Sequence, residues 1–199
     1  MNEKIIKSPL LKFWTLNTVP TVDIKTTKTP EKIKILFSNS LEDLLKKQGG
    51  RLHVNQCEQL MSDIHQQFIK LNKHNMSIAY FDIDDIVIIE NKYYFINDKK
   101  ILTISSNHLT IKKLYNTESL FLPYEMGNEQ LSIQLPLKVH INSYIYSLAI
   151  LTLFCLFNTM FNSRAEALTV LNQITGIELY WCLSRCLDIE PKNRKLLFI

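Results

Sequence analysis

The feature that most constrains the fold is a run of fourteen residues, Tyr144 to Phe157, that contains no charged side chain. The run reads YIYSLAILTLFCLF and is apolar nearly all round a helix, so it predicts a helix buried on every side. A transmembrane helix needs about 20 such residues, and we therefore expect no membrane span. The rest of the chain must supply the core that encloses this helix.

The composition is that of an ordinary globular protein. The chain has 199 residues, of which 46% are hydrophobic and 21% are charged, so disordered and fibrous classes are excluded. This length suits one domain with a short arm. The net charge of +4 is too mild to indicate nucleic acid as a partner.

The cysteines indicate a reducing, intracellular compartment. Three of the four lie in strongly apolar helical stretches, where a free thiol behaves as a small hydrophobic group. Cys182 and Cys186 are four residues apart, but no second pair of Cys or His with ligand spacing lies nearby. We therefore predict neither a disulfide framework nor a metal site at these residues.

Residues 1–31 are expected to form an irregular arm, because they carry three prolines and most of a polar run that extends from Asp23 to Lys32. Within this arm only Leu10 to Leu16 looks like a strand. The first residues are charged and no long apolar run follows them, so no signal peptide is predicted. The folded domain is expected over residues 32–199.

Beyond residue 31 the pattern is mainly helical. Ser40 with Asp43 three residues later is a capping box, which predicts a helix over Leu41–Gln48. Two short apolar runs around a polar turn predict a hairpin over Ile86–Ile89 and Tyr93–Ile96. The other elements expected are a strand over Lys32–Ser38 and helices over Val54–Lys73, His140–Phe157, Arg164–Gln173 and Ile177–Asp188. The predicted fold class is mainly α, of the α+β type.

Several segments carry a resemblance when they are taken in chain order. They are KIKILFS (32–38), the stretch from 40 to 78, IAYFDIDDIVII (78–89), YYFIND (93–98), SLFLPYEM (119–126), IYSLAIL (145–151) and LYWCLSRCLDIEPKNRKLLFI (179–199). In this order they resemble the C-terminal lobe of a eukaryotic-type protein kinase, from the hinge strand through the catalytic loop, metal loop and activation segment to the closing helices. The resemblance implies a kinase-like C-lobe whose N-lobe is strongly reduced or missing. Similar truncated chains occur in large DNA viruses. The excess of Ile, Lys and Asn, which is typical of AT-rich coding sequences, fits that source.

The groups that a kinase uses for phosphoryl transfer are largely missing. No glycine precedes Gly49, so no Gly-rich loop can cover a nucleotide. Lys12 and Lys25 precede the hinge strand, but neither has the apolar flank of the family's nucleotide-binding lysine. The His-Arg-Asp slot contains Tyr80-Phe81-Asp82, and Asp85 falls in the slot of the metal-binding Asn. The resemblance therefore implies no catalytic residues, no metal and no cofactor.

The metal loop is altered as well. By register Asn97 replaces the family's metal-binding Asp, which leaves a neutral, vestigial slot, and Asp98 lies one position off. Lys99 and Lys100 place positive charge where a metal ion would sit. We therefore expect no metal-dependent transfer at this loop.

Three carboxylates, those of Asp82, Asp84 and Asp85, crowd four positions of the catalytic-loop slot. They form either a rebuilt metal site or a solvated acidic turn that caps a helix or strand. The first interpretation would make the chain an active atypical Ser/Thr kinase that uses ATP and Mg²⁺. Asp82 would then be the base, Asp98 a metal ligand, and Asp85 the residue in the Asn slot.

Structural features of the resemblance survive. Glu125 occupies the slot of the glutamate that ends the activation segment, and Arg194 occupies the slot of its buried arginine partner. The resemblance implies an ion pair between them, whereas the alternative is two unrelated surface charges. Tyr144 stands where the family has an Asp that caps the catalytic-loop backbone, so that cap is expected to be lost.

These observations predict a pseudokinase that acts as an interaction or scaffolding module. Another protein is the expected partner, self-association is possible, and the location is the host cytoplasm or the virion if the source is viral. The expected contact surfaces are the 97–121 segment and apolar surface near Leu36, Phe37 and Ile88. The alternatives are the active kinase and a basic nucleic-acid-binding virion protein.

Overall fold

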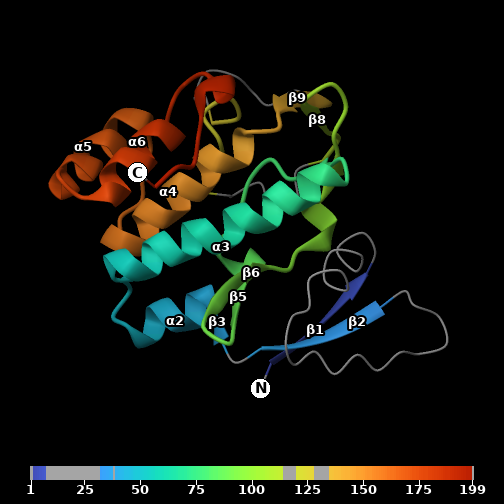
Figure 1. The fold of residues 1–199 in the computed structure, drawn as a ribbon, viewed down its shortest axis with the longest axis horizontal. Helices are drawn as coiled ribbons and strands as arrows, with labels where there is room; N and C mark the ends of the chain where they lie inside the picture. Colours follow the sequence, from blue (N-terminus) through green and yellow to red (C-terminus); the bar gives the residue numbers. More distant parts are fainter. Residues whose placement is uncertain (1, 8–31, 38, 114–119, 128–134, 199) are drawn as a thin grey trace.

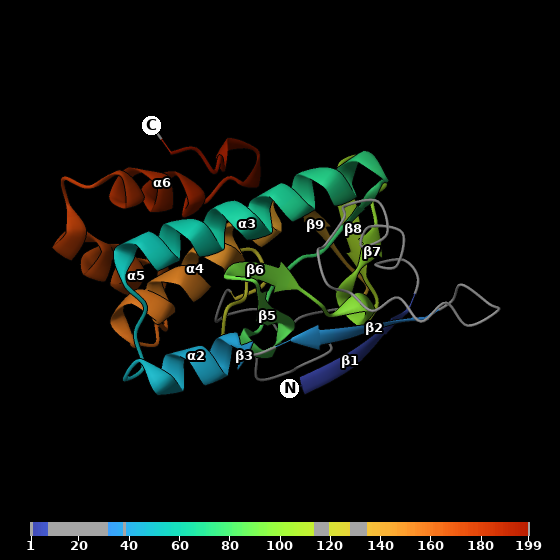
Figure 2. The same ribbon diagram turned by 60° about the horizontal axis from the view of Figure 1, so that its bottom comes forward.

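The computed structural model describes residues 2–7, 32–37, 39–113, 120–127 and 135–198, with backbone only for the first two ranges. The described chain is a mixed α and β structure in which helices outweigh strands and the sheets are small. Helices α3 and α4 run side by side through the middle, and α5 and α6 pack at one end of α4 (Figure 1). The turned view places the small sheets around the other end and below the helices (Figure 2).

Helix α4 (Ser143–Phe157) is the central element that the apolar run predicts. Twelve of its residues are buried, and nine of these belong to the larger hydrophobic core. The helix begins three residues later than expected, because Leu137–His140 pairs as strand β9 instead. Asn158 ends α4 in the left-handed conformation at φ 53°, which Asn tolerates better than most residues.

Helices α2 (Leu41–Lys47) and α3 (Val54–Lys73) confirm the expected elements. The capping box at the start of α2 is present: Asp43 N–H donates to Ser40 Oγ at 3.0 Å, and Ser40 N–H donates to Asp43 Oδ2 at 3.1 Å. Helix α3 is amphipathic, and its apolar stripe packs against α4 and strand β6. Local capping and periodicity therefore decide both helices.

The expected hairpin is also present, as β5 (Ile86–Ile89) and β6 (Lys92–Phe95) in antiparallel register. Glu90 and Asn91 form its turn with φ values of 48° and 62°, which is the sign that a tight hairpin turn requires. Strand β3 (Asn39–Ser40) pairs with the other edge of β5. Ile88 is buried in this sheet, so its predicted exposure is wrong.

The N-terminal arm is not wholly irregular. Strand β1 (Asn2–Lys7) pairs antiparallel with β2 (Lys32–Phe37), from Asn2 opposite Phe37 to Lys7 opposite Lys32. The predicted strand over Leu10–Leu16 lies outside the described residues. The predicted apolar surface at Leu36 and Phe37 lies outside the described side chains.

Four short strands at the far end of α3 form two further two-stranded sheets. Strand β8 (His108–Ile111) pairs with β9, which the sequence analysis did not predict. Strand β4 (Met76–Ser77) pairs with β7 (Leu102–Thr103). Leu109 and Val139 of the β8–β9 pair help to form a second, smaller core with Tyr80.

The chain closes with α5 (Arg164–Leu171), a 3₁₀ turn η3 (Asn172–Ile174), α6 (Glu178–Cys186) and a 3₁₀ turn η4 (Pro191–Asn193). The four cysteines are buried free thiols, which agrees with the predicted role of small hydrophobic groups. Among the described helices, none combines the length and apolar character that crossing a bilayer requires.

Candidate functional site

The loop between β4 and β5 holds the candidate site, and α4 anchors this loop. Phe81 N–H donates to Ser147 Oγ of α4 at 2.8 Å. The Phe81 ring packs edge-on against Phe68 and Phe95, with centroids 5.4 and 5.8 Å away. Backbone and side chain of Phe81 are thus both held by buried neighbours, which fixes the carboxylates that follow.

We expected the loop backbone to lack a cap from α4, and the contact with Ser147 shows that this expectation is wrong. Tyr144 does not bind the loop backbone; its hydroxyl lies 3.0 Å from Nδ1 of His65 on α3. Ser147, one turn further along α4, accepts the loop's N–H instead. Ser147 could not be identified from the sequence, because a serine inside an apolar run has no motif that marks its partner.

The acidic loop is folded into a 3₁₀ turn, η1 (Ile83–Asp85), that its own carboxylates cap. Asp82 N–H donates to Asp85 Oδ2 at 2.7 Å. The carboxylates of Asp82, Asp84 and Asp85 each have an oxygen within 4.8 Å of the others. Asp84 is exposed, but Asp82 and Asp85 are buried. The capping prediction is therefore confirmed, whereas the expected solvation is wrong for these two.

Lys100 supplies the cation that these two buried carboxylates contact. Its Nζ lies 2.5 Å from Asp82 Oδ2 and 2.6 Å from Asp85 Oδ2, and the residue is 4% exposed. The ammonium also lies 4.5 Å from the centre of the Tyr80 ring, within the range of a cation–π contact. Lys100 is the last residue of the 3₁₀ turn η2 (Asp98–Lys100), which carries it under the acidic loop.

In this network burial disfavours the charged forms, and pairing between the ammonium and the carboxylates opposes burial. Burial lowers the pKa of Lys100, but the carboxylates of Asp85 and Asp82 oppose it, and the pKa lies above its usual value of 10.5. Burial raises the pKa of Asp85 above its usual value of 3.8, a shift that Lys100 and Asn97 oppose. The ammonium of Lys100 contacts both carboxylates, so charge-assisted hydrogen bonds offset part of the cost of burying it.

Asn97 joins the same network. Its Nδ2 donates to Asp85 Oδ1 at 2.6 Å, while its Oδ1 accepts the N–H of Lys99 at 3.3 Å and so caps η2. Asp98 is half-buried and lies outside the acidic group defined above. The structure therefore brings Asp82, Asp85 and Asn97 together but not Asp98.

These residues do not fit a divalent metal ion while Lys100 is in place. Mg²⁺ requires several oxygen ligands in near-octahedral geometry. The facing oxygens of Asp82 and Asp85 are bound to the ammonium, and the second oxygen of Asp85 accepts from Asn97. The sequence does place two lysines, Lys99 and Lys100, directly after Asn97-Asp98. Spacing alone did not identify which of the two contacts the buried carboxylates.

Glu125 and Arg194 form the second predicted constellation. Arg194 Nη1 and Nη2 donate to the two carboxylate oxygens of Glu125 at 3.0 and 2.7 Å. The guanidinium also donates to the carbonyls of Asp188 and Ile189 at 2.8 and 3.0 Å. Arg194 is 1% exposed, so the alternative of two unrelated surface charges is wrong.

Ser143 and Tyr146 on the first turn of α4 complete this cluster. The Ser143 hydroxyl donates to Glu125 Oε1 and lies 2.6 Å from the carbonyl oxygen of His140. The Tyr146 ring lies beneath the guanidinium, 4.9 Å from ring centre to Cζ. Burial raises the pKa of Tyr146 to about 12, so its hydroxyl stays neutral. The cluster joins the 121–127 turn, α4 and the closing turn of the chain.

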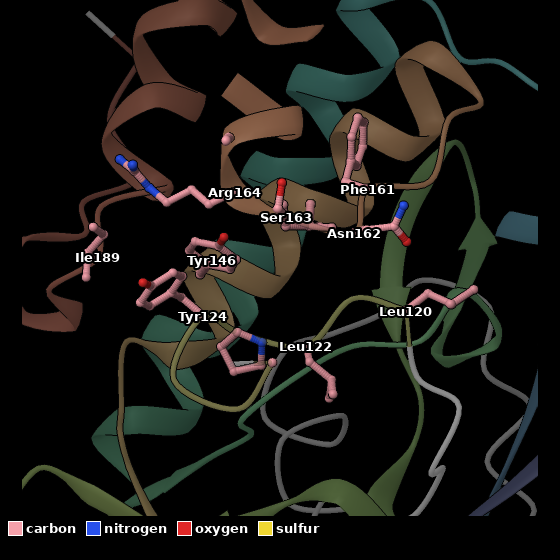
Figure 3. A pocket seen from close by; sticks show the side chains of 13 residues that line it. Leu120, Leu122, Tyr124, Tyr146, Phe161, Asn162, Ser163, Arg164 and Ile189 are labelled. Atoms are coloured by element: carbon pink, nitrogen blue, oxygen red, sulfur yellow. The ribbon is translucent and has the colours of Figure 1, made fainter. Parts of the chain in front are cut away.

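A hollow of about 690 Å³ opens beside this cluster (Figure 3). Tyr146 and Ile150 of α4 lie on its inner side, and Tyr124 and Phe161 form parts of its walls. The other lining residues come from the 120–127 turn, the start of α5 and the closing turn: Leu120, Leu122, Pro123, Gly127, Asn162, Ser163, Arg164, Ala165 and Ile189. No pattern in the sequence predicted this hollow.

Comparison with known proteins adds no family assignment: neither a protein-family model nor a curated protein matches this chain.

Proposed function

We propose that this chain is a catalytically inactive, kinase-like C-lobe that acts as a protein-interaction module. The observation that carries the proposal is the position of Lys100. Its ammonium binds Asp82 and Asp85, the two residues that the kinase resemblance places in the base and metal-ligand slots. A positive charge bound there competes with Mg²⁺. It also pairs with Asp82, which is then not available to accept the proton of a substrate hydroxyl.

The preserved packing framework supports the kinase-like part of the proposal. Glu125 and Arg194 meet in the bidentate geometry that the resemblance implies. Ser147 of α4 caps the loop backbone at Phe81, the contact for which the resemblance implies an Asp. A kinase-like fold that no longer transfers phosphate can still act by presenting a binding surface. We propose that another protein binds to this surface.

Nucleotide binding and phosphoryl transfer test the inactive part of the proposal. The full chain is heated with and without ATP and millimolar Mg²⁺ or Mn²⁺, and transfer of labelled phosphate to a generic protein acceptor is measured in parallel. We expect no shift in melting temperature and no transfer, because Lys100 holds the acidic groups. Asp84→Asn is the matched control for Asp82→Asn and Asp98→Asn, since Asp84 is exposed and lies outside the Lys100 contacts.

A melting shift together with transfer would overturn the proposal if Asp82→Asn or Asp98→Asn abolished both while Asp84→Asn kept them. The interaction part is tested separately by affinity purification from cells that produce the chain. We expect a protein recovered in comparable molar amounts by the wild type and by Asp82→Asn, because the acidic network is internal. A chain recovered alone, and monomeric by light scattering, would contradict this part.

A further inference from the structure

The hollow beside α4 is elongated and apolar at both ends. Leu120 and Ile189 lie at opposite ends of it (Figure 3) and are 60% and 46% exposed. Between them, the buried side chains of Tyr146 and Ile150 form its inner side. Apolar side chains exposed at two separated ends suit an extended segment that crosses the hollow better than they suit a compact ligand.

The charge of the hollow is one-sided. Among the thirteen described residues that line it, Arg164 is the one with a charged side chain, and none carries a carboxylate. Arg164 Nε donates to the Leu187 carbonyl at 2.7 Å, which orients the guanidinium and leaves its two terminal nitrogens outside that bond. A planar guanidinium held in this way suits a carboxylate, which it can bind through two parallel hydrogen bonds.

We propose that the hollow binds an extended peptide segment of a partner protein in which an Asp or Glu lies beside a bulky apolar side chain. The apolar side chain packs against Tyr146 and Ile150, and the carboxylate pairs with Arg164. This inference rests on the proposed interaction function and names its surface and the chemistry of its partner. It does not depend on the state of the Lys100 network, so the two proposals fail separately.

The test selects peptides from a phage-displayed library of random sequences on the immobilised full chain. Synthetic copies of the enriched peptides are then titrated by fluorescence polarisation. We expect enrichment of Asp or Glu next to Leu, Ile, Phe or Met. Replacing that acid by its amide in the peptide is expected to weaken binding by about tenfold, and binding should weaken further as salt is raised.

Two variants of the chain locate the binding site. Arg164→Met removes the charge and should weaken acidic peptides about tenfold, with little further loss for the amide peptide. Ala165→Phe adds bulk at an exposed lining position without removing any side-chain polar group, and should abolish binding. Trp181→Ala is the matched control, because Trp181 is exposed on α6 and does not line the hollow.

The proposal is overturned if no peptide is enriched or if the enriched peptides lack an acid. It is also overturned if the Ala165→Phe variant still binds the peptides while circular dichroism shows an intact fold. Loss of binding in the Trp181→Ala control would overturn it as well. A second copy of the chain as the occupant would appear as self-association that Ala165→Phe abolishes, and this outcome too would exclude the peptide. If peptides bind as expected and phosphoryl transfer is nevertheless detected, the inactive part of the proposed function fails alone.

Discussion

Arg194 holds Glu125, 69 residues earlier in the chain, through two hydrogen bonds of 3.0 and 2.7 Å between guanidinium and carboxylate. The pair ties the 121–127 turn to the last turn of the chain. Both groups also bind other partners, since Arg194 donates to two carbonyls and Glu125 accepts from Ser143. Removing Glu125 therefore leaves Arg194 with a desolvated charge, and removing Arg194 leaves Glu125, whose side chain is 22% exposed, with a partly desolvated one.

Arg194→Met is expected to lower the free energy of unfolding by about 3–5 kcal/mol, because Glu125 loses its counter-charge and two carbonyls lose their donor. Urea unfolding measures this change. Arg194→Lys should restore less than half of it, since one ammonium cannot make the planar contacts. Lys46→Ala, which breaks the exposed pair with Glu42, is the control and should leave the free energy of unfolding nearly unchanged. Equal losses for Arg194→Met and Lys46→Ala would contradict the buried role of the Arg194 pair.

Lys100→Met removes the cation between two buried carboxylates and should destabilise the chain by about 3–5 kcal/mol at pH 7. Burial raises the pKa of Asp85 in the folded state and Lys100 opposes that shift, so without the ammonium the pKa of Asp85 should rise further above its unfolded value. Protonation then favours the folded variant, so the difference from the wild type should shrink as the pH falls toward 4. Unfolding curves across this pH range measure the difference, and Lys99→Met is the matched control because Lys99 is exposed. A difference that stays constant with pH would show that Asp85 is not the group that Lys100 stabilises.

Ser147→Ala should destabilise the chain by about 1–3 kcal/mol, because the buried N–H of Phe81 loses its acceptor. Thr152→Val tests the same helix with a hydroxyl that bonds only within it, to the Leu148 carbonyl. That carbonyl lies within the α4 helix, so we expect a cost below about 1 kcal/mol. Chemical denaturation of both variants, with hydrogen exchange at Phe81, distinguishes them. Similar losses in the two variants, with unchanged exchange at Phe81, would refute the role given to Ser147.

The stability of the chain should fall as the pH drops below about 6.5. Burial lowers the pKa of His65 below its usual value of 6.5, so the unfolded state binds a proton at a higher pH than the folded state does. Stability is therefore present above the unfolded pKa and is lost as the pH falls toward the folded pKa. His65→Gln should give a shallower slope of melting temperature between pH 7.5 and 5.5. The slope should not vanish, because burial also lowers the pKa of His140. An unchanged slope would show that His65 does not contribute to the pH dependence of stability.

The elements that the sequence predicted are those decided by near neighbours in the chain. Apolar spacing every three or four residues marks α3, an uninterrupted apolar run marks α4, and Ser40 with Asp43 marks the start of α2. In each case the determining groups lie within a few residues of one another, so the pattern can be recognised without knowing what packs against it.

Pairing between distant segments was not predictable in this way. Strand β9 was not predicted and its last residue, His140, was assigned to the following helix. Strand β1 was taken as irregular. Both were missed because a short strand is defined by its hydrogen-bonded partner. The kinase resemblance did suggest one distant pair, Glu125 with Arg194, since it supplied a partner that spacing could not.

The acidic loop shows the same limit in its chemistry. The sequence places three carboxylates and two lysines in the region, and that pattern is compatible with a metal site as well as with the solvated turn that we expected. The fold turns Lys100 inward, across 15 residues, to Asp85. Burial and counter-charge arise from segments that meet only after folding, and together they decide whether an acidic cluster binds a metal ion or an internal ammonium.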